Sequence, residues 1–132
     1  MDISKEDYLR VMYELYETEK AGIKSVDVAD KLNVSKSSVS QMIRKLNKGG
    51  LVFSEPYSKL RFTDKGLNEA RRIMHNHRVI ETFLKNVLEY DLSKVHEEAH
   101  CLEHAFSEDS IKRLDKFLSH PKKSPYGRVI PH

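Results

Sequence analysis

The sequence predicts a mainly α-helical protein with a small β-wing, in which a region of short helices precedes a longer all-helical region. Three observations lead to this prediction. Apolar residues recur at helical spacing along most of the chain. Two short alternating runs flank a turn that contains Pro56. No glycine or proline interrupts residues 67–86. We therefore expect a winged helix-turn-helix followed by an all-helical domain.

Length and composition are typical of a globular protein of one domain or two small ones. The chain has 132 residues, of which 39% are apolar, and a single cysteine, Cys101, that excludes an intramolecular disulfide. No apolar run approaches the roughly 18–20 residues that span a bilayer, and the first residues lack a signal-peptide pattern. We expect a soluble cytoplasmic protein that does not contact membranes.

The first helix is predicted to start after Ser4 and to continue to about Glu19. Ser4 and Asp7 have the spacing of a capping box, and apolar side chains follow at helical intervals. The Asp7 carboxylate is also a candidate metal ligand. Spacing alone leaves the cap and the ligand equally open for Asp7.

Two short helices are predicted next, one capped by Ser25 and one capped by Ser35 that ends at Lys48 before two glycines. A tight turn at Asn33–Val34 joins them. The expected core side of the first of these helices consists of Val26, Val28, Ala29 and Leu32. Two short helices joined by a three- to four-residue turn form a helix-turn-helix.

The outward face of the helix ending at Lys48 is predicted to bind DNA. It consists of small hydroxyls, one amide and cations: Lys36, Ser37, Ser38, Ser40, Gln41, Arg44, Lys45 and Lys48. Gln41 can pair with adenine edges, the serines can approach bases and phosphates, and the cations can neutralise the backbone. Residues 31–61 carry seven basic side chains and one acidic one, a balance that suits a polyanion. Any polar face of a surface helix shares part of this pattern.

A hairpin of residues 51–55 and 60–63 is predicted to form the wing. Its turn, residues 56–59, places Lys59 near the tip, where the ammonium group can contact phosphate or the minor groove. The predicted DNA-binding set therefore also includes Ser25, Ser35 and Lys59. We expect the DNA-binding domain to comprise residues 1–63.

The second part is predicted to contain a long helix from Asp64 to about residue 86, a helix capped by Ser93 and a last helix capped by Ser107. We expect a dimerisation and metal-binding domain over residues 64–120, because its apolar surface exceeds what three short helices cover in one another. Pro121 ends regular structure, and residues 121–132 are expected to form an extended tail.

One helical face in this part carries a row of candidate metal ligands, His96, His100, Glu103 and His104. Buried ionisable groups are costly unless they are paired or metal-bound. His77 and Glu81, four residues apart, and Asp7 are candidates for the remaining ligands. Nitrogen and oxygen donors of this kind suit a borderline divalent first-row metal. The alternative is that these histidines are solvated or serve as ordinary polar contacts.

These motifs together resemble the diphtheria-toxin-repressor family, which includes iron-dependent repressors and manganese transport regulators. The resemblance covers essentially the whole chain. It rests on the winged helix-turn-helix, on His77-Arg78-x-x-Glu81 and on Val95-His96-Glu97-Glu98-Ala99-His100-x-x-Glu103-His104, with further matches at residues 6–9, 37–40 and 124–131.

The resemblance implies a homodimeric, metal-activated repressor of metal-uptake genes that binds a palindromic operator in double-stranded DNA and takes no small organic substrate. It implies up to two divalent ions per subunit, Mn²⁺ or Fe²⁺ in the first place, with Zn²⁺, Ni²⁺ and Co²⁺ left open. One site takes His77, Glu81 and His96, and the other takes Asp7, His100, Glu103 and His104.

The sequence also departs from the family pattern. The position of His100 is usually Cys in iron-type members and Glu in manganese-type members, which leaves the metal open. Arg10 stands where manganese-type members carry a second carboxylate. The larger relatives add an SH3-like domain, without which water or Glu98 would complete the His77 site. We expect Cys101 to be a buried thiol and not a ligand.

Two other classes of function remain as alternatives. A di-iron enzyme would need a second Glu-x-x-His in addition to Glu97-x-x-His100, and the sequence contains no second copy. Neither a catalytic triad pattern nor a phosphate-binding glycine loop is apparent, so we do not expect an enzyme. A winged-helix regulator that senses an organic ligand would show no effect of metal on DNA affinity.

Overall fold

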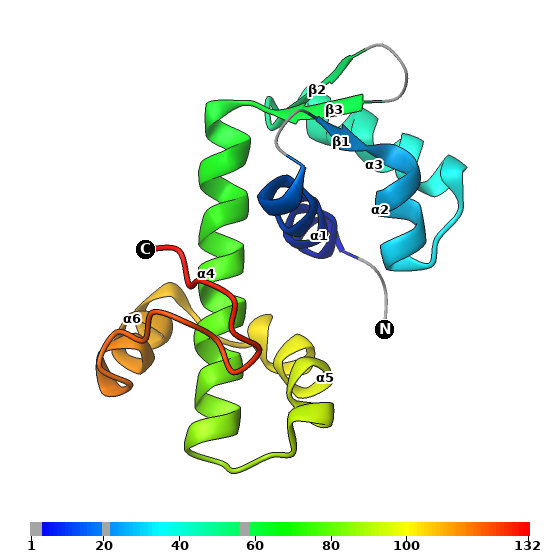
Figure 1. Cartoon of the computed structure of the whole chain (residues 1–132). Coiled ribbons are helices and arrows are strands. Elements are labelled where there is room, and N and C mark those ends of the chain that lie inside the picture. Colours follow the sequence, from blue (N-terminus) through cyan, green and yellow to red (C-terminus); the bar gives the residue numbers. More distant parts are fainter. Residues whose placement is uncertain (1–3, 20–21, 56–58) are drawn as a thin grey trace. The chain divides into compact units, whose positions relative to one another are not determined.

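The computed structural model describes residues 4–19, 22–55 and 59–132, and these form two compact units, one up to residue 73 and one over residues 74–132 (Figure 1). The elements are α1 (Lys5–Thr18), β1 (Ile23–Lys24), α2 (Ser25–Leu32), α3 (Lys36–Lys48), β2 (Val52–Glu55), β3 (Lys59–Phe62), α4 (Asp64–Asn86), α5 (Leu92–Glu103) and α6 (Glu108–Phe117). This confirms the predicted winged helix-turn-helix followed by helices.

The start of α1 is the predicted capping box. The Ser4 hydroxyl accepts a hydrogen bond from the Asp7 backbone N–H at 3.2 Å, and Asp7 Oδ2 accepts one from the Ser4 N–H at 2.8 Å. These bonds satisfy backbone donors that the first turn of a helix leaves without partners. The capping role predicted for Asp7 is therefore confirmed.

Helices α2 and α3 form the helix-turn-helix. Asn33 ends α2 with φ of 53°, a left-handed conformation that asparagine tolerates, and the Ser35 hydroxyl caps α3 by accepting from the Ser38 N–H at 3.1 Å. Two predictions for α2 are wrong. Lys24 occupies the N-cap position, so that Ser25 is the first helical residue, and Val26 is 43% exposed and lies outside the core. Val28 and Ala29 are buried as predicted.

The wing is part of a three-stranded antiparallel sheet in the order β1-β3-β2 (Figure 1). β2 pairs with β3 from Val52 opposite Phe62 to Glu55 opposite Lys59, and Ile23 of β1 pairs with Leu60. Strand β1 was not predicted, because two residues are too few to show a strand period. The turn was predicted at residues 56–59, but Lys59 is the first residue of β3, so this part of the prediction is wrong. Residues 56–58 lie outside the described residues.

The first turns of α4 belong to the first compact unit, and Gly66 allows them to approach the strand region closely. A Cβ atom added to Gly66 would lie 1.7 Å from the backbone carbonyl oxygen of Leu51. The predicted domain boundary after residue 63 coincides with the start of α4, whereas the two compact units divide within this helix, after residue 73.

Gly66→Ala is expected to lower the free energy of unfolding by about 1–3 kcal/mol or more, because the new methyl group overlaps backbone that cannot move aside cheaply. Urea unfolding followed by circular dichroism measures this loss. Asn68→Ala, at an exposed position of the same helix, is the control and should change stability little. Equal stability of the two variants would contradict the close approach.

The second unit has its core between α4, α5 and α6. Ile80, Leu84, Val95, Ala99 and Ile111 form a buried cluster, which is bordered by the partly buried Tyr90, Leu102, Phe106 and Leu114. Ser107 caps α6 as predicted, since its hydroxyl accepts from the Ser110 N–H at 3.1 Å. The prediction that Ser93 caps α5 is wrong, because Asp91 is the N-cap residue and Ser93 lies in the first turn.

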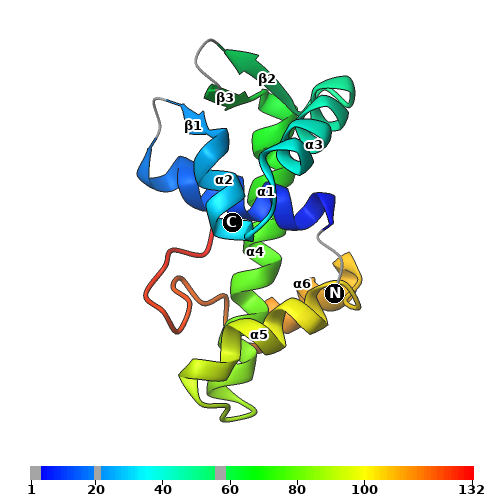
Figure 2. The ribbon, with the colours of Figure 1, turned by 90° about the vertical axis from the view of Figure 1, so that its right-hand side faces the viewer.

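Residues 121–132 fold back on themselves and do not form the extended tail that was predicted (Figure 2). Lys123 and Val129 form an antiparallel bridge, and the Ile130 N–H donates to the Lys122 carbonyl at 2.8 Å. Ile130 is buried, and the buried Arg78 of α4 donates to the Val129 carbonyl at 2.6 Å. The tail is therefore an ordered part of the second unit.

Within the described residues, none of the helices is long and apolar enough to cross a membrane.

Candidate metal and DNA sites

The predicted DNA-binding face of α3 is exposed along its whole length. Its buried stripe is Val39, Ile43 and Leu46. The polar residues on its other sides are all exposed: Lys36, Ser37, Ser38, Ser40, Gln41, Arg44, Lys45 and Lys48. The first turn of α3 contains no acidic side chain. Helix dipole and cations therefore give this face a positive field that suits phosphate.

The serine hydroxyls at the start of α3 form one small cluster. Ser35 Oγ lies 3.1 Å from Ser37 Oγ and donates to Ser38 Oγ at 2.9 Å. Ser25 is half-buried in the first turn of α2. Lys59 is half-buried in β3, where the strand register places it opposite Glu55 of β2 and Lys24 of β1. The DNA-contacting roles of these residues remain predictions.

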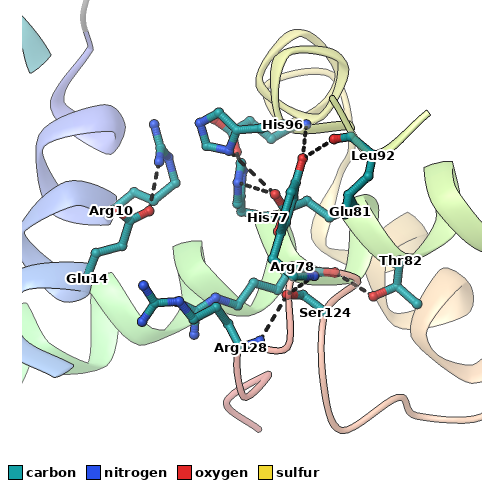
Figure 3. Close-up of polar contacts among 12 residues, drawn as sticks. Arg10, Glu14, His77, Arg78, Glu81, Thr82, Leu92, His96, Ser124 and Arg128 are labelled. Atoms are coloured by element: carbon teal, nitrogen blue, oxygen red, sulfur yellow. Dashed lines mark hydrogen bonds and ion pairs between the residues drawn. The ribbon is translucent and has the colours of Figure 1, made fainter. Parts of the chain in front are cut away.

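One predicted set of metal ligands is close together in the structure (Figure 3). It consists of His77 and Glu81 of α4 and His96 of α5. One nitrogen of each ring and one carboxylate oxygen lie within 4.8 Å of one another. Glu81 Oε2 is 3.3 Å from His77 Nε2 and 3.4 Å from His96 Nδ1. Two imidazoles and a carboxylate at this spacing can hold a divalent ion after small side-chain movements.

Charge in this cluster is balanced by the carboxylates. Burial alone would lower the pKa of His77, but hydrogen bonds and the negative charges of Glu103 and Glu81 outweigh burial, so that the pKa lies above its ordinary value. Burial alone would raise the pKa of Glu81, but hydrogen bonds to His77 and His96 lower it to about 2. The raised pKa favours a protonated His77 between the two carboxylates in the metal-free protein.

The end of α5 carries His100, Glu103 and His104. The His100 and His104 rings lie 5.7 Å apart between centroids, and His104 is the C-cap residue of the helix. Glu103 Oε2 accepts a hydrogen bond from His77 Nδ1 at 2.6 Å. His77 therefore faces Glu81 with one nitrogen and Glu103 with the other, a link between the two ligand sets that sequence spacing could not indicate.

Asp7 lies in α1, in the other compact unit, where Oδ2 serves the capping box. Arg10, one turn later, is buried and pairs with Glu14 at 3.2 Å, and Glu14 also lies 3.5 Å from Lys31. Arg10 is thus held by an ion pair within its own unit. Metal ligation by Asp7 remains a prediction.

Comparison with known proteins assigns both parts of the chain to one family. Residues 3–60 match the iron-dependent repressor N-terminal DNA-binding domain, and residues 63–132 match the iron-dependent repressor metal-binding and dimerisation domain. The chain belongs to the iron-dependent repressor family. Proteins of this family are transcriptional repressors and not enzymes.

Similar proteins differ in length. An HTH-type transcriptional regulator of Methanocaldococcus jannaschii is 38% identical over 118 residues, which are 89% of this chain and 94% of the relative. The diphtheria toxin repressor of Corynebacterium diphtheriae is 35% identical over 96% of this chain, which spans 55% of that protein. The solved manganese regulator SloR is 42% identical, with a TM-score of 0.87 over 100% of this chain and 61% of SloR.

Two features distinguish this repressor-family chain from what its sequence predicted. Cys101 is exposed, so the prediction of a buried thiol is wrong: it lies on the outer side of α5, one position beyond His100. Tyr126 was missed. Its hydroxyl donates to the Leu92 carbonyl at 2.6 Å and accepts from the His96 N–H at 3.2 Å, so that the tail holds the first turn of the ligand helix.

The stability of the metal-free repressor is expected to fall as the pH rises above about 6.5. The pKa of His77 is higher in the folded protein than its ordinary value of 6.5, so its stabilising contribution is complete below pH 6.5 and is lost as the pH rises through the folded pKa. Glu81, with a folded pKa of about 2 against 4.5, stabilises above pH 4.5 and ceases to do so as the pH falls towards 2.

Urea unfolding in a chelator between pH 5 and pH 9 measures this dependence. His77→Gln should flatten the decline above pH 6.5, since glutamine does not titrate. Stability that stays constant or increases over that range in the wild type would contradict a proton held between Glu81 and Glu103.

Proposed function

We propose that this chain is a cytoplasmic, metal-activated repressor that acts as a homodimer. It binds a palindromic operator in double-stranded DNA and controls genes for metal-ion uptake. The observation that carries the proposal is the link between α4 and α5, where His77 joins Glu81 to Glu103. Through this contact, His77 connects two sets of candidate metal ligands. The same chain also carries an exposed cationic helix, α3, that suits DNA.

We assign His77, Glu81 and His96 to one site, and Asp7, His100, Glu103 and His104 to a second. Imidazoles and carboxylates without a thiolate favour Mn²⁺ or Fe²⁺ over softer ions, and nitrogen donors also accept Zn²⁺, Ni²⁺ and Co²⁺. The ion would supply the positive charge that a proton supplies in the metal-free cluster. His77 would then bind through Nε2 while its Nδ1–H donates to Glu103, the carboxylate–histidine arrangement that orients metal ligands.

This bond provides a physical route for cooperation between the sites. An ion at the first site fixes the His77 ring, and the ring fixes Glu103 as a ligand for the second site. Asp7 belongs to the DNA-binding unit, whereas His100, Glu103 and His104 belong to the other unit. Binding at the second site would therefore select one arrangement of the two units.

Repression requires two recognition helices at a fixed separation. A dimer that reads a palindrome needs its helices one turn of DNA apart, roughly 34 Å. The exposed Val87, Leu88 and Leu92, at the junction of α4 and α5, offer apolar surface for the contact between subunits. On the DNA we assign base contacts to Gln41 and phosphate or sugar contacts to Ser25, Ser35, Lys36, Ser37, Ser38, Arg44, Lys45, Lys48 and Lys59.

Binding of the wild-type protein to a candidate palindromic operator tests this proposal. The measurement is made anaerobically at fixed salt, with chelator and then with Mn²⁺, Fe²⁺ or Zn²⁺. We expect at least one ion to tighten binding by about 5- to 150-fold, the range of ordinary allosteric coupling. Equal affinity with and without every ion would refute metal activation and favour a winged-helix regulator that senses an organic ligand.

A further inference from the structure

A third cluster of metal-binding side chains lies away from the two sets described above. His75 of α4, Asp115 of α6 and His132 of the folded tail each place one ligand atom within 4.8 Å of the others. The three residues come from three separate segments of the second unit. They have no part in the ligand sets that the sequence or the family resemblance indicated.

The hydrogen bonds of both histidines occupy one nitrogen of each ring and leave the other available as a metal ligand. His75 Nδ1 lies 2.6 Å from the Pro131 carbonyl oxygen, and His132 Nε2 lies 3.1 Å from the Pro121 carbonyl oxygen. A carbonyl oxygen only accepts, so these nitrogens carry the hydrogens and the lone pairs are on His75 Nε2 and His132 Nδ1. Histidines that ligate metals are oriented in this way, by donating the other N–H to a carbonyl or carboxylate.

Asp115 supplies a charge that its surroundings only partly satisfy. The residue is 7% exposed, and its Oδ1 atom makes no hydrogen bond within the described part of the chain. Oδ2 accepts from His120 Nδ1 at 2.9 Å and lies 3.9 Å from His132 Nδ1. A buried carboxylate oxygen without a partner is costly, and a bound cation is one of the few groups that satisfy it.

We propose that His75, Asp115 and His132 form a third divalent-metal site, which fastens residues 121–132 to α4 and α6. Two imidazoles and one carboxylate, with water in the remaining position, suit Zn²⁺ or a similar first-row ion. Ligand atoms around tetrahedral Zn²⁺ lie about 3.3 Å apart, as Zn–N bonds of about 2.0 Å require. The half-exposed His132 ring can make the small closing movement.

The site would support the first ligand cluster through the tail. Between α6 and the proposed ligand His132, the tail carries two residues that contact α4 and α5. The Val129 carbonyl accepts from Arg78, and the Tyr126 hydroxyl donates to the Leu92 carbonyl in the first turn of α5. An ion that fixes His132 therefore restricts the segment that positions His96. This role does not depend on DNA binding, so its test is separate from that of the proposed function.

The test is Zn²⁺ content per subunit after equilibrium dialysis of the full chain against a weak chelator. Asp115→Asn and His132→Ala are each expected to lose one Zn²⁺ per subunit relative to wild type. Asp109→Asn is the matched control, an acid-to-amide change at an exposed position of α6, and should keep the wild-type content. The same loss should appear in a background of His96→Ala and His104→Ala, where the other two sites are impaired.

Zn²⁺ should also slow tryptic cleavage after the exposed Lys122 and Lys123 in wild type and Asp109→Asn, but not in His132→Ala. His132→Ala keeps the test valid if Asp115→Asn fails to fold. Unchanged Zn²⁺ content in His132→Ala would overturn the proposal and leave these histidines as anchors of the tail only.

Discussion

His104→Ala is expected to abolish the metal-stimulated part of operator binding while leaving the fold and the metal-free affinity unchanged. Without His104 the proposed second site should no longer hold an ion. The metal-dependent increase in operator affinity, about 5- to 150-fold, should therefore disappear. The His104 side chain is 34% exposed, and Glu103, whose Oε1 lies 3.8 Å from it, keeps its contact with His77 when His104 is removed. Operator affinity with and without Mn²⁺ measures the effect.

Glu103→Gln provides an independent version of this experiment. It removes a ligand of the second site and also the charge that faces His77 at 2.6 Å, so both sites should bind metal less tightly. Glutamine keeps the shape of the side chain and limits the loss of stability that alanine would cause at this buried pair. Glu97→Gln, an exposed position on α5, is the control. Metal-stimulated binding that persists in both Glu103→Gln and His104→Ala would refute the second site.

Removing cations from the recognition helix is expected to have the second largest effect. Arg44→Ala, Lys45→Ala and Lys48→Ala should each weaken binding to all DNA sequences and reduce the slope of log affinity against log salt by about 1 for each phosphate that is no longer neutralised. The effect arises because fewer counterions are released when DNA binds. Lys112→Ala, an exposed cation on α6, should leave the slope unchanged.

Gln41→Ala should behave differently from the lysine and arginine variants. A side chain that reads a base edge affects discrimination by about 1–3 kcal/mol at one position of the operator, with little change in the salt slope. Binding to operators with single base changes distinguishes the two cases. A uniform loss across all sequences for Gln41→Ala would assign Gln41 to the backbone and not to a base.

Several local features could be predicted from the sequence because short-range physical chemistry determines them. Ser4 with Asp7, Ser35 and Ser107 begin their helices as expected, since a side-chain oxygen three residues before a free backbone N–H is the strongest local start signal. The exposed face of α3 followed from helical periodicity in the same way. The predicted caps at Ser25 and Ser93 were wrong, because the N-cap positions are occupied by Lys24 and Asp91 instead. A serine near the start of a helix therefore does not by itself fix the first residue of that helix.

The candidate ligands were recognisable as residue types, but their partners were not. Spacing along one helix placed His96, His100, Glu103 and His104 in a row, yet gave no indication that Glu103 would bond to His77, 26 positions earlier. Distances between helices depend on how their apolar faces pack, here through Ile80, Leu84, Val95 and Ala99.

The sequence by itself determined the order of the helices and of strands β2 and β3, the capped starts of α1, α3 and α6, and the cationic face of α3. Only the tertiary structure decided that His77 connects two ligand sets, that the tail folds back through Ile130, and that His75, Asp115 and His132 meet. The physical reason is the distance along the sequence over which each interaction acts. Caps and periodicity act within a few residues. By contrast, His77 and Glu103 are 26 positions apart, Arg78 and Val129 are 51 apart, and His75, Asp115 and His132 are 17–57 apart, so packing must bring them together.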